Sequence, residues 1–282
     1  MTTTLEAEYD NRARVPEHPA IFARWKRNAS AYRAATVNAG RAELALRYGP
    51  TERQTIDLFY PSERDGAPLA MFIHGGYWRS LEPALFSHIA RGLNAHGVTV
   101  AVVGYDLCPQ VRITDIIAQV QAAACFLWDR FGQRMLVYGH SAGGHLAACL
   151  VATDWSAHDE RLPADLTAVG MTVSGVFDLT PLLQVSMNAD LRMDAAEAAR
   201  VSPLTWPAGA DRTLDVIVGA DESGAFRGQS QRIAATWDEA GANTRYEERL
   251  NANHFTIIDP LCDPDSADVH RLVTLASRTM ER

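Results

Sequence analysis

The stretch Met135-Leu-Val-Tyr-Gly-His-Ser-Ala-Gly-Gly-His-Leu-Ala-Ala-Cys-Leu-Val-Ala152 decides the fold of this 282-residue chain. Met135–Tyr138 is a short apolar run that predicts a buried strand, and His145–Ala152 predicts an apolar helix. Between them, Gly139-His-Ser-Ala-Gly143 fits the G-x-S-x-G pattern of a nucleophile elbow. That turn is so tight that side chains two residues before and after the serine would clash, which explains both glycines. We therefore predict that Ser141 projects its hydroxyl at the carboxyl end of a strand.

The rest of the chain alternates in the same way between strand and helix patterns. Residues 53–60 alternate in polarity like a half-exposed strand, and five short apolar runs are typical of strands buried on both faces. Helical spacing of apolar residues occurs over Ile113–Phe131 and Phe226–Ala240. Together these patterns predict a doubly wound α/β fold, whose mostly parallel sheet binds ligands at the carboxyl ends of its strands. The five runs are 69–73, 98–103, 135–138, 169–173 and 214–218.

Two segments fall outside this alternation. Residues 1–42 are polar, rich in Arg and Ala and interspersed with aromatic residues, which predicts a helical arm packed over a main α/β domain of residues 43–282. Residues Thr180–Asp211 contain two short helical patterns and several prolines, and they are too long for an ordinary connection. We expect this insertion to lie above the sheet as a small cap.

Composition and charge argue against several classes of protein. With 47% hydrophobic and 21% charged residues, the chain is ordinary for a globular protein. Its 34 acidic residues outnumber its 26 basic ones. The sequence contains no cluster of four or more Lys and Arg residues, so we expect no nucleic-acid partner. No apolar run is long enough to cross a membrane and no secretion signal is visible, so we expect a cytoplasmic protein without a membrane partner. The four widely spaced cysteines are expected to be buried thiols.

A serine hydroxyl needs a base to remove its proton and an acid to orient that base. In this arrangement the acid and then the histidine follow the serine along the chain. Among nine histidines, His254 follows a strand-like segment in the position expected of the base. Asp221 comes directly after another strand and is the expected acid. Glu222, its neighbour, and Asp178, after the preceding strand, are the alternatives.

The other histidines are expected to pack or form hydrogen bonds near the site, or to lie on the solvated surface. His140 and His145 flank the elbow from sides that cannot reach the serine hydroxyl, so we expect packing contacts or hydrogen bonds. The histidines lack the spacing of metal ligands, and a serine mechanism needs neither a metal nor a cofactor. The histidines expected on the solvated surface are His18, His88, His96, His158 and His270.

The segment His74-Gly-Gly-Tyr-Trp78, directly after a predicted strand, is the third candidate element. Acyl transfer passes through a tetrahedral oxyanion, which requires backbone N–H donors that are already in place. We expect the N–H groups of Gly76, Tyr77 and Ala142 to supply this oxyanion hole, with Gly75 allowing the backbone to turn. His74 is expected to hold the loop by hydrogen bonds.

These motifs, in this order, resemble those of the α/β-hydrolase superfamily and, within it, of the kynurenine formamidases (arylformamidases). The resemblance covers roughly residues 43–265. The similar stretches are His74–Trp78, Tyr105–Pro109, the elbow with Gly144–Leu146, Phe177–Pro181, Asp221–Ser223 with Phe226–Ser230, and Asn253–Phe255.

The resemblance implies an α/β-hydrolase fold in which Ser141 is the nucleophile, Asp221 the acid and His254 the base, beside an oxyanion hole in the HGGYW loop. It implies hydrolysis of N-formylkynurenine to formate and kynurenine in tryptophan breakdown, hence a small aromatic substrate, and it suggests a homodimer. The candidates for lining an aromatic substrate pocket are Tyr77, Trp78, Phe177 and Trp206.

Three other functions stay open from the sequence. A carboxylesterase acting on small, short-chain esters would use the same residues. A non-catalytic small-molecule binding protein on a hydrolase scaffold would usually lack one of the three reacting side chains, whereas candidates for all three are present. A lipase for larger substrates would be expected to carry an extended apolar lid, which the chain does not show.

Overall fold

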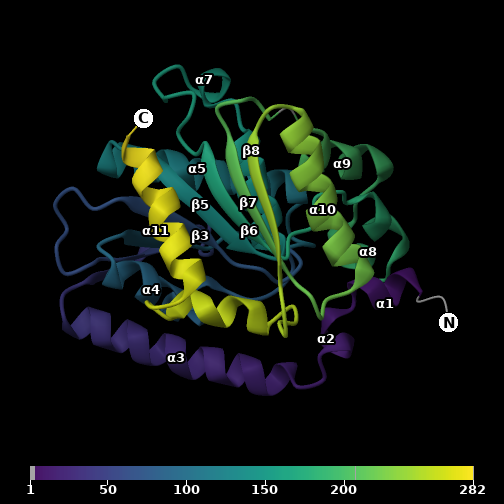
Figure 1. The fold of residues 1–282 in the computed structure, drawn as a ribbon, viewed down its shortest axis with the longest axis horizontal. Coiled ribbons are helices and arrows are strands. Elements are labelled where there is room, and N and C mark those ends of the chain that lie inside the picture. Colours follow the sequence, from purple (N-terminus) through teal and green to yellow (C-terminus); the bar gives the residue numbers. More distant parts are fainter. Residues whose placement is uncertain (1–3, 207, 282) are drawn as a thin grey trace.

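The strands of this protein form one mixed sheet through its centre, as seen in a computed structural model that describes residues 4–206 and 208–281 (Figure 1). The spatial order is β1-β2-β4-β3-β5-β6-β7-β8. The pairs β1–β2 and β2–β4 are antiparallel, and every other pair is parallel, which confirms the predicted fold class. The strands are β1 (Ala42–Arg47), β2 (Thr55–Phe59), β3 (Leu69–Ile73), β4 (Thr99–Val103), β5 (Met135–His140), β6 (Val169–Val173), β7 (Thr213–Gly219) and β8 (Asn243–Arg249).

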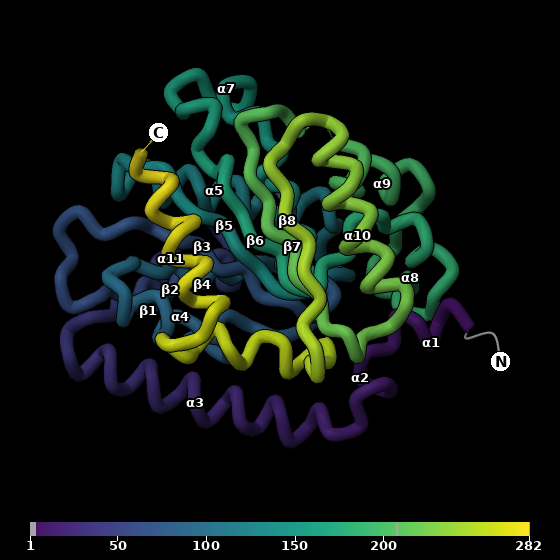
Figure 2. The backbone as a smooth tube through the Cα atoms, in the orientation of Figure 1, coloured from purple at the N-terminus to yellow at the C-terminus, as the bar shows by residue number. Residues whose placement is uncertain are grey.

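Helices cover both faces of the sheet (Figures 1 and 2). On one face lie α3 (His18–Asn38), α4 (Ala90–Ala95) and α11 (Ala267–Met280). On the other lie α5 (Ile113–Phe131), α6 (Ala142–Ala152) and α10 (Gly224–Glu239). The short α-helices are α1 (Leu5–Tyr9), α2 (Asn11–Arg14), α7 (Trp155–His158), α8 (Asn188–Leu191) and α9 (Ala195–Arg200), and the 3₁₀ helices are η1 (Pro83–Ile89), η2 (Thr180–Gln184), η3 (Pro203–Thr205) and η4 (Thr256–Cys262).

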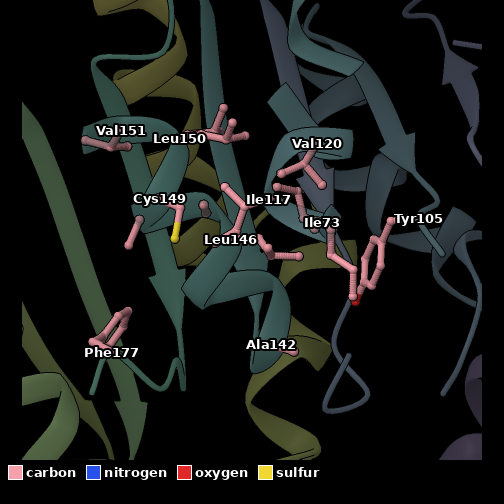
Figure 3. Close-up of a cluster of buried hydrophobic side chains, with 14 of the residues drawn as sticks. Ile73, Tyr105, Ile117, Val120, Ala142, Leu146, Cys149, Leu150, Val151 and Phe177 are labelled. Atoms are coloured by element: carbon pink, nitrogen blue, oxygen red, sulfur yellow. The ribbon is translucent and has the colours of Figure 1, made fainter. Parts of the chain in front are cut away.

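The central strands are apolar throughout because both of their faces are covered. Within β3, Met71 and Ile73 belong to the hydrophobic cluster beneath α5 and α6, whereas Ala70 and Phe72 belong to the cluster beneath α3, α4 and α11. Successive residues of a strand point to opposite faces, so a strand between two helical layers has no polar face. Figure 3 shows part of the first cluster, where Leu146 of α6 lies near Ile117 of α5.

The sequence pattern did not predict β1. This strand lies at the edge of the sheet and its pairing with β2 shifts between Glu43 and Leu46, around Ala45 with φ 56°. Because of this bulge, Leu44 packs against one hydrophobic cluster and Leu46 against the other. The bulge therefore removes the two-residue alternation by which such a strand is recognised.

The N-terminal helices meet the segment that was expected to form a cap. Ile21 and Trp25 of α3 are buried against the body of the protein. The carboxylate of Glu6 in α1 accepts hydrogen bonds from the backbone N–H (2.8 Å) and hydroxyl (2.6 Å) of Ser186, between η2 and α8. The N-terminal helix α1 therefore lies beside the segment that contains η2 and α8 (Figure 1).

Some expected burials differ from those observed. All four cysteines are free, but Cys125 and Cys262 are only partly buried. His88, expected on the surface, is 4% exposed, and burial lowers its pKa to about 4. None of the described helices is both long enough and apolar enough to cross a membrane.

Candidate active site

Ser141 lies in the turn between β5 and α6 with φ 57° and ψ −120°, a conformation that residues with a side chain rarely adopt. A Cβ atom added to Gly139 would lie 2.2 Å from the carbonyl oxygen of Gly143. One added to Gly143 would lie 1.9 Å from the carbonyl oxygen of Ile73 in β3. Both glycines are therefore required for the close approach of α6 to the sheet, as the elbow motif predicts.

The hydroxyl of Ser141 lies at the start of a line of hydrogen bonds. Its Oγ is 3.0 Å from Nε2 of His254, whose Nδ1 is 2.7 Å from Oε2 of Glu222. The three residues are 2%, 3% and 4% exposed, respectively. A carboxylate accepts the proton of Nδ1, which leaves Nε2 able to take the serine proton. The arrangement can therefore convert the hydroxyl into a nucleophile.

The acid in this line is Glu222, and the prediction of Asp221 is wrong. Residues 219–222 form a tight turn in which the N–H of Glu222 donates to the carbonyl of Gly219 over 3.1 Å. Ala220 and Asp221 are the corner residues of this turn, and Asp221 is exposed to solvent. Glu222 follows the corner and is buried beside His254. The sequence places both acids at the end of β7, but the register of the turn selects between them.

Both carboxylate oxygens of Glu222 have partners. Oε1 accepts hydrogen bonds from the N–H of Gly219 over 2.8 Å and from the hydroxyl of Ser174. Ser174 directly follows β6, the neighbour of β7, and has φ 54°. These donors hold the carboxylate in one orientation toward His254. Sequence reasoning missed Ser174, whose position at a strand's carboxyl end was the available signal.

Asp178, the other alternative for the acid, has a structural place. Its Oδ1 accepts hydrogen bonds from the N–H (3.0 Å) and the hydroxyl (2.5 Å) of Thr180 at the start of η2. It thus caps the following turn and takes no part in the line that ends at Ser141.

Two histidines support the site without contacting the serine. Nε2 of His140 lies 2.7 Å from the carbonyl oxygen of His254 and so holds the loop after β8. Nδ1 of His74 lies 2.7 Å from the carbonyl oxygen of Gly75, and its ring stacks on Tyr105 at 4.4 Å between ring centres. Burial lowers the pKa of His74 to about 4 and that of His140 well below its usual range, so both are neutral near pH 7.

The loop after β3 lies directly against the elbow. A Cβ atom added to Gly75 would be 2.9 Å from Cβ of Ser141, and Gly76 has φ 114°, which favours glycine. Within the described part of the chain, the N–H groups of Gly76, Tyr77 and Ala142 have no hydrogen-bond acceptor. Ala142 also begins α6, whose N-terminus favours negative charge. These donors are available to an oxyanion beside Ser141.

A pocket of about 380 Å³ opens onto Ser141 and His254, a size that suits a small molecule. Tyr77, Ser186 and Phe255 line it, but much of its wall comes from the N-terminal helices. The lining residues from this region include Glu6, Tyr9, Asn11, Arg12, Phe22 and Trp25. The hydroxyl of Tyr77 donates to the carbonyl of Tyr9 over 2.6 Å, which ties this wall to the loop after β3.

Three of the predicted pocket residues lie elsewhere. Trp78 is fully buried and packs edge-on against His145, with 5.0 Å between ring centres. Phe177 is also fully buried, in the cluster shown in Figure 3. The indole N–H of Trp206 donates to the carbonyl of Arg200. Of the aromatic candidates only Tyr77 lines the pocket, whose other aromatic residues were missed because most of them come from the distant N-terminal region.

Comparison with known proteins shows the family of the chain. Residues 70–257 match the family described as alpha/beta hydrolase fold. The chain belongs to the α/β-hydrolase family. This hydrolase is 31% identical over 224 residues to the kynurenine formamidase of Danio rerio, covering 77% of this chain and 75% of that protein. It is 32% identical over 231 residues to the kynurenine formamidase of Salmo salar, covering 79% of this chain and 78% of that one.

A solved structure has the same fold. A protein of Silicibacter sp. TM1040, described provisionally as a thioesterase, matches the hydrolase with a TM-score of 0.84 at 35% identity. The match covers 96% of this chain and 99% of that chain. Among the residues that the structure describes, no group of three or more His, Cys, Asp or Glu side chains is placed to hold a metal ion.

Proposed function

We propose that this hydrolase cleaves small aryl formamides of the N-formylkynurenine type through a covalent intermediate on Ser141. As Oγ attacks the formyl carbon, His254 takes the hydroxyl proton on Nε2 and Glu222 stabilises the imidazolium. The oxyanion binds the N–H groups of Gly76, Tyr77 and Ala142.

The tetrahedral intermediate then collapses with balanced proton transfers. The C–N bond breaks, and the proton on Nε2 of His254 passes to the leaving arylamine, which leaves a formyl ester on Ser141. A water molecule attacks this ester, giving one proton to Nε2, and that proton passes to the serine oxygen as formic acid departs and ionises to formate in solution.

The observation that carries the proposal is the line of hydrogen bonds from Ser141 through His254 to Glu222, beside backbone N–H groups that have no acceptor among the described residues. The aromatic lining from Phe22, Trp25 and Phe255 supports an aryl group in the pocket. The identity of about 30% with two kynurenine formamidases supports the formamide bond.

The test compares acyl groups on one aryl leaving group, together with N-formylkynurenine and the 4-nitrophenyl esters of acetate and butyrate. We expect kcat/KM to fall at least about tenfold from formyl to acetyl and further to butyryl, since the larger acyl groups need space beside the nucleophile. Ser141→Ala should lower kcat about 10³-fold or more with an unchanged unfolding midpoint. Near-normal turnover by this variant would refute the mechanism.

A short-chain ester or thioester hydrolase is the second candidate. It is favoured by the structure that is 35% identical and provisionally described as a thioesterase. A higher kcat/KM for plain esters or thioesters than for formamides would assign this function. If a fluorophosphonate probe does not label Ser141 and no substrate is hydrolysed, the protein is a binding protein on a hydrolase scaffold.

A further inference from the structure

We infer that Arg12 of α2 binds a carboxylate on the arylamine part of the substrate, so that the hydrolase selects anionic aryl formamides. This inference rests on the proposed function. A formyl group carries no side chain, so the pocket can recognise the substrate only through its amine part. The charges in the pocket wall therefore indicate which amines fit.

The acidic side chains in the pocket wall already accept hydrogen bonds. Glu6 accepts from the N–H and hydroxyl of Ser186 at 2.8 and 2.6 Å. Asp10 accepts from the N–H of Ala13 over 3.0 Å and so caps α2. Asp190 is 2.6 Å from the guanidinium of Arg79, which also lines the pocket.

Arg12 is the cation of the pocket wall that lacks such a partner. Within the described residues its guanidinium has no ion pair and no hydrogen bond, and its carbon lies 5.8 Å from the ring centre of Phe22. An arginine lying over an aromatic ring keeps its N–H edges free for a planar carboxylate, which it can bind through two parallel hydrogen bonds.

Aromatic contacts connect Arg12 with the reacting side chains. The Phe22 ring stacks on Trp25 at 5.0 Å and meets Phe255 edge-on at 5.1 Å. The Phe255 ring is in turn 5.4 Å from the ring of His254, all distances being between ring centres. An arylamine that lies on this wall with its formamide near Ser141 can extend a carboxylate-bearing side chain toward Arg12.

The substrate class is thus an aryl formamide whose amine part carries a carboxylate at the end of a side chain. N-formylkynurenine belongs to this class, and its carboxamide is a matched probe because it keeps the ring, the formamide and the ammonium group but loses the negative charge. We expect the wild-type kcat/KM to be about tenfold or more higher for the carboxylate, in line with a charge-assisted hydrogen bond.

Arg12→Gln should lower kcat/KM for N-formylkynurenine about tenfold or more, mainly through KM, and change that for the carboxamide much less. Arg14→Gln is the matched control, because Arg14 lies in the same short helix, is 3.9 Å from Glu8 and is absent from the pocket lining. It should leave the preference for the carboxylate unchanged. The unfolding midpoints of both variants should match that of the wild type.

Two results would overturn the inference while the proposed function stands: equal turnover of carboxylate and carboxamide by the wild type, or an equal loss on both substrates in Arg12→Gln. Failure to hydrolyse either formamide, with turnover of 4-nitrophenyl acetate intact, would overturn the proposed function and the inference with it.

Discussion

The carboxylate of Glu222 touches His254 on one side and is held by two donors on the other, the N–H of Gly219 and the hydroxyl of Ser174. In the proposed reaction it keeps the proton on Nδ1 of the imidazole and stabilises the cation that forms. Asp221 carries the same charge one residue earlier but faces solvent. The two neighbours therefore form a natural pair for a test.

We expect Glu222→Gln to lower kcat about 10³-fold or more, because the amide cannot stabilise the imidazolium and can favour the wrong tautomer. Asp221→Asn should change kcat by no more than about threefold. Steady-state kinetics on one aryl substrate, with unfolding midpoints to show that both variants fold, makes the comparison. A greater loss in Asp221→Asn would contradict the assignment of the acid.

The packing of α6 against the sheet requires a glycine at position 143. At Gly143 the backbone of α6 passes so close to β3 that an added Cβ would lie 1.9 Å from a carbonyl oxygen of the strand. Gly228 in α10 has no neighbour within 4 Å of the same added atom. Glycine is thus required by packing in one helix, whereas in the other it only costs backbone entropy.

Substituting alanine at these two positions should have opposite effects. Gly143→Ala forces α6 away from the sheet and should lower the free energy of unfolding by about 3 kcal/mol or more. Gly228→Ala should raise it by about 0.5–1 kcal/mol, since alanine favours the helix. Urea unfolding of the two variants measures both changes. If Gly143→Ala were as stable as the wild type, the tight contact between α6 and β3 would be wrong.

Buried neutral histidines link the stability of the entire chain to pH. Burial lowers the pKa of His74, His88 and His145 to about 4 each. In the unfolded chain a histidine has a pKa of about 6.5, so between about pH 6.5 and 4 the unfolded state binds more protons than the folded state. The stability that these residues contribute above pH 6.5 is therefore lost as the pH falls through this window.

We expect the free energy of unfolding to be constant near pH 7.5 and to fall progressively from about pH 6.5 toward pH 4.5, by up to about 1.4 kcal/mol per pH unit for each histidine, with a matching fall in the urea midpoint. His88→Gln cannot take up this proton and should reduce the slope, whatever its effect at pH 7.5. A midpoint that stays level over the window would show that these side chains are protonated in the folded state.

The N-terminal helices complete the molecule by forming one wall of the pocket. Arg12, Phe22 and Trp25 lie more than a hundred residues before Ser141 in the chain, yet they line the same pocket. Glu6 in α1 joins this wall to Ser186, and Glu8 accepts the N–H of Ala225 at the start of α10 over 2.9 Å. These contacts place the residues that we propose to select the substrate.

The alternation of strands and helices, the elbow at Ser141 and the loops that carry Gly76 and His254 could all be predicted from the sequence. These features follow from short-range rules: side chains alternate across a strand, helices repeat every 3.6 residues, and only glycine fits the tightest turns. Because β5, β6, β7 and β8 are parallel, the loops after β5 and β8 lie at the same edge of the sheet, and the loop after β8 brings His254 into contact with Ser141.

The choice of Glu222 over Asp221, the burial of Trp78 and Phe177, and the pocket wall with Arg12 came only from the tertiary structure. The first depends on a shift of one residue in a turn, which moves a side chain from the protein interior to solvent. The others depend on packing between segments far apart in the chain, which no local pattern encodes. Local sequence patterns thus determine where the motifs of the site lie along the chain, whereas the shape of the pocket depends on how distant segments pack in the folded protein.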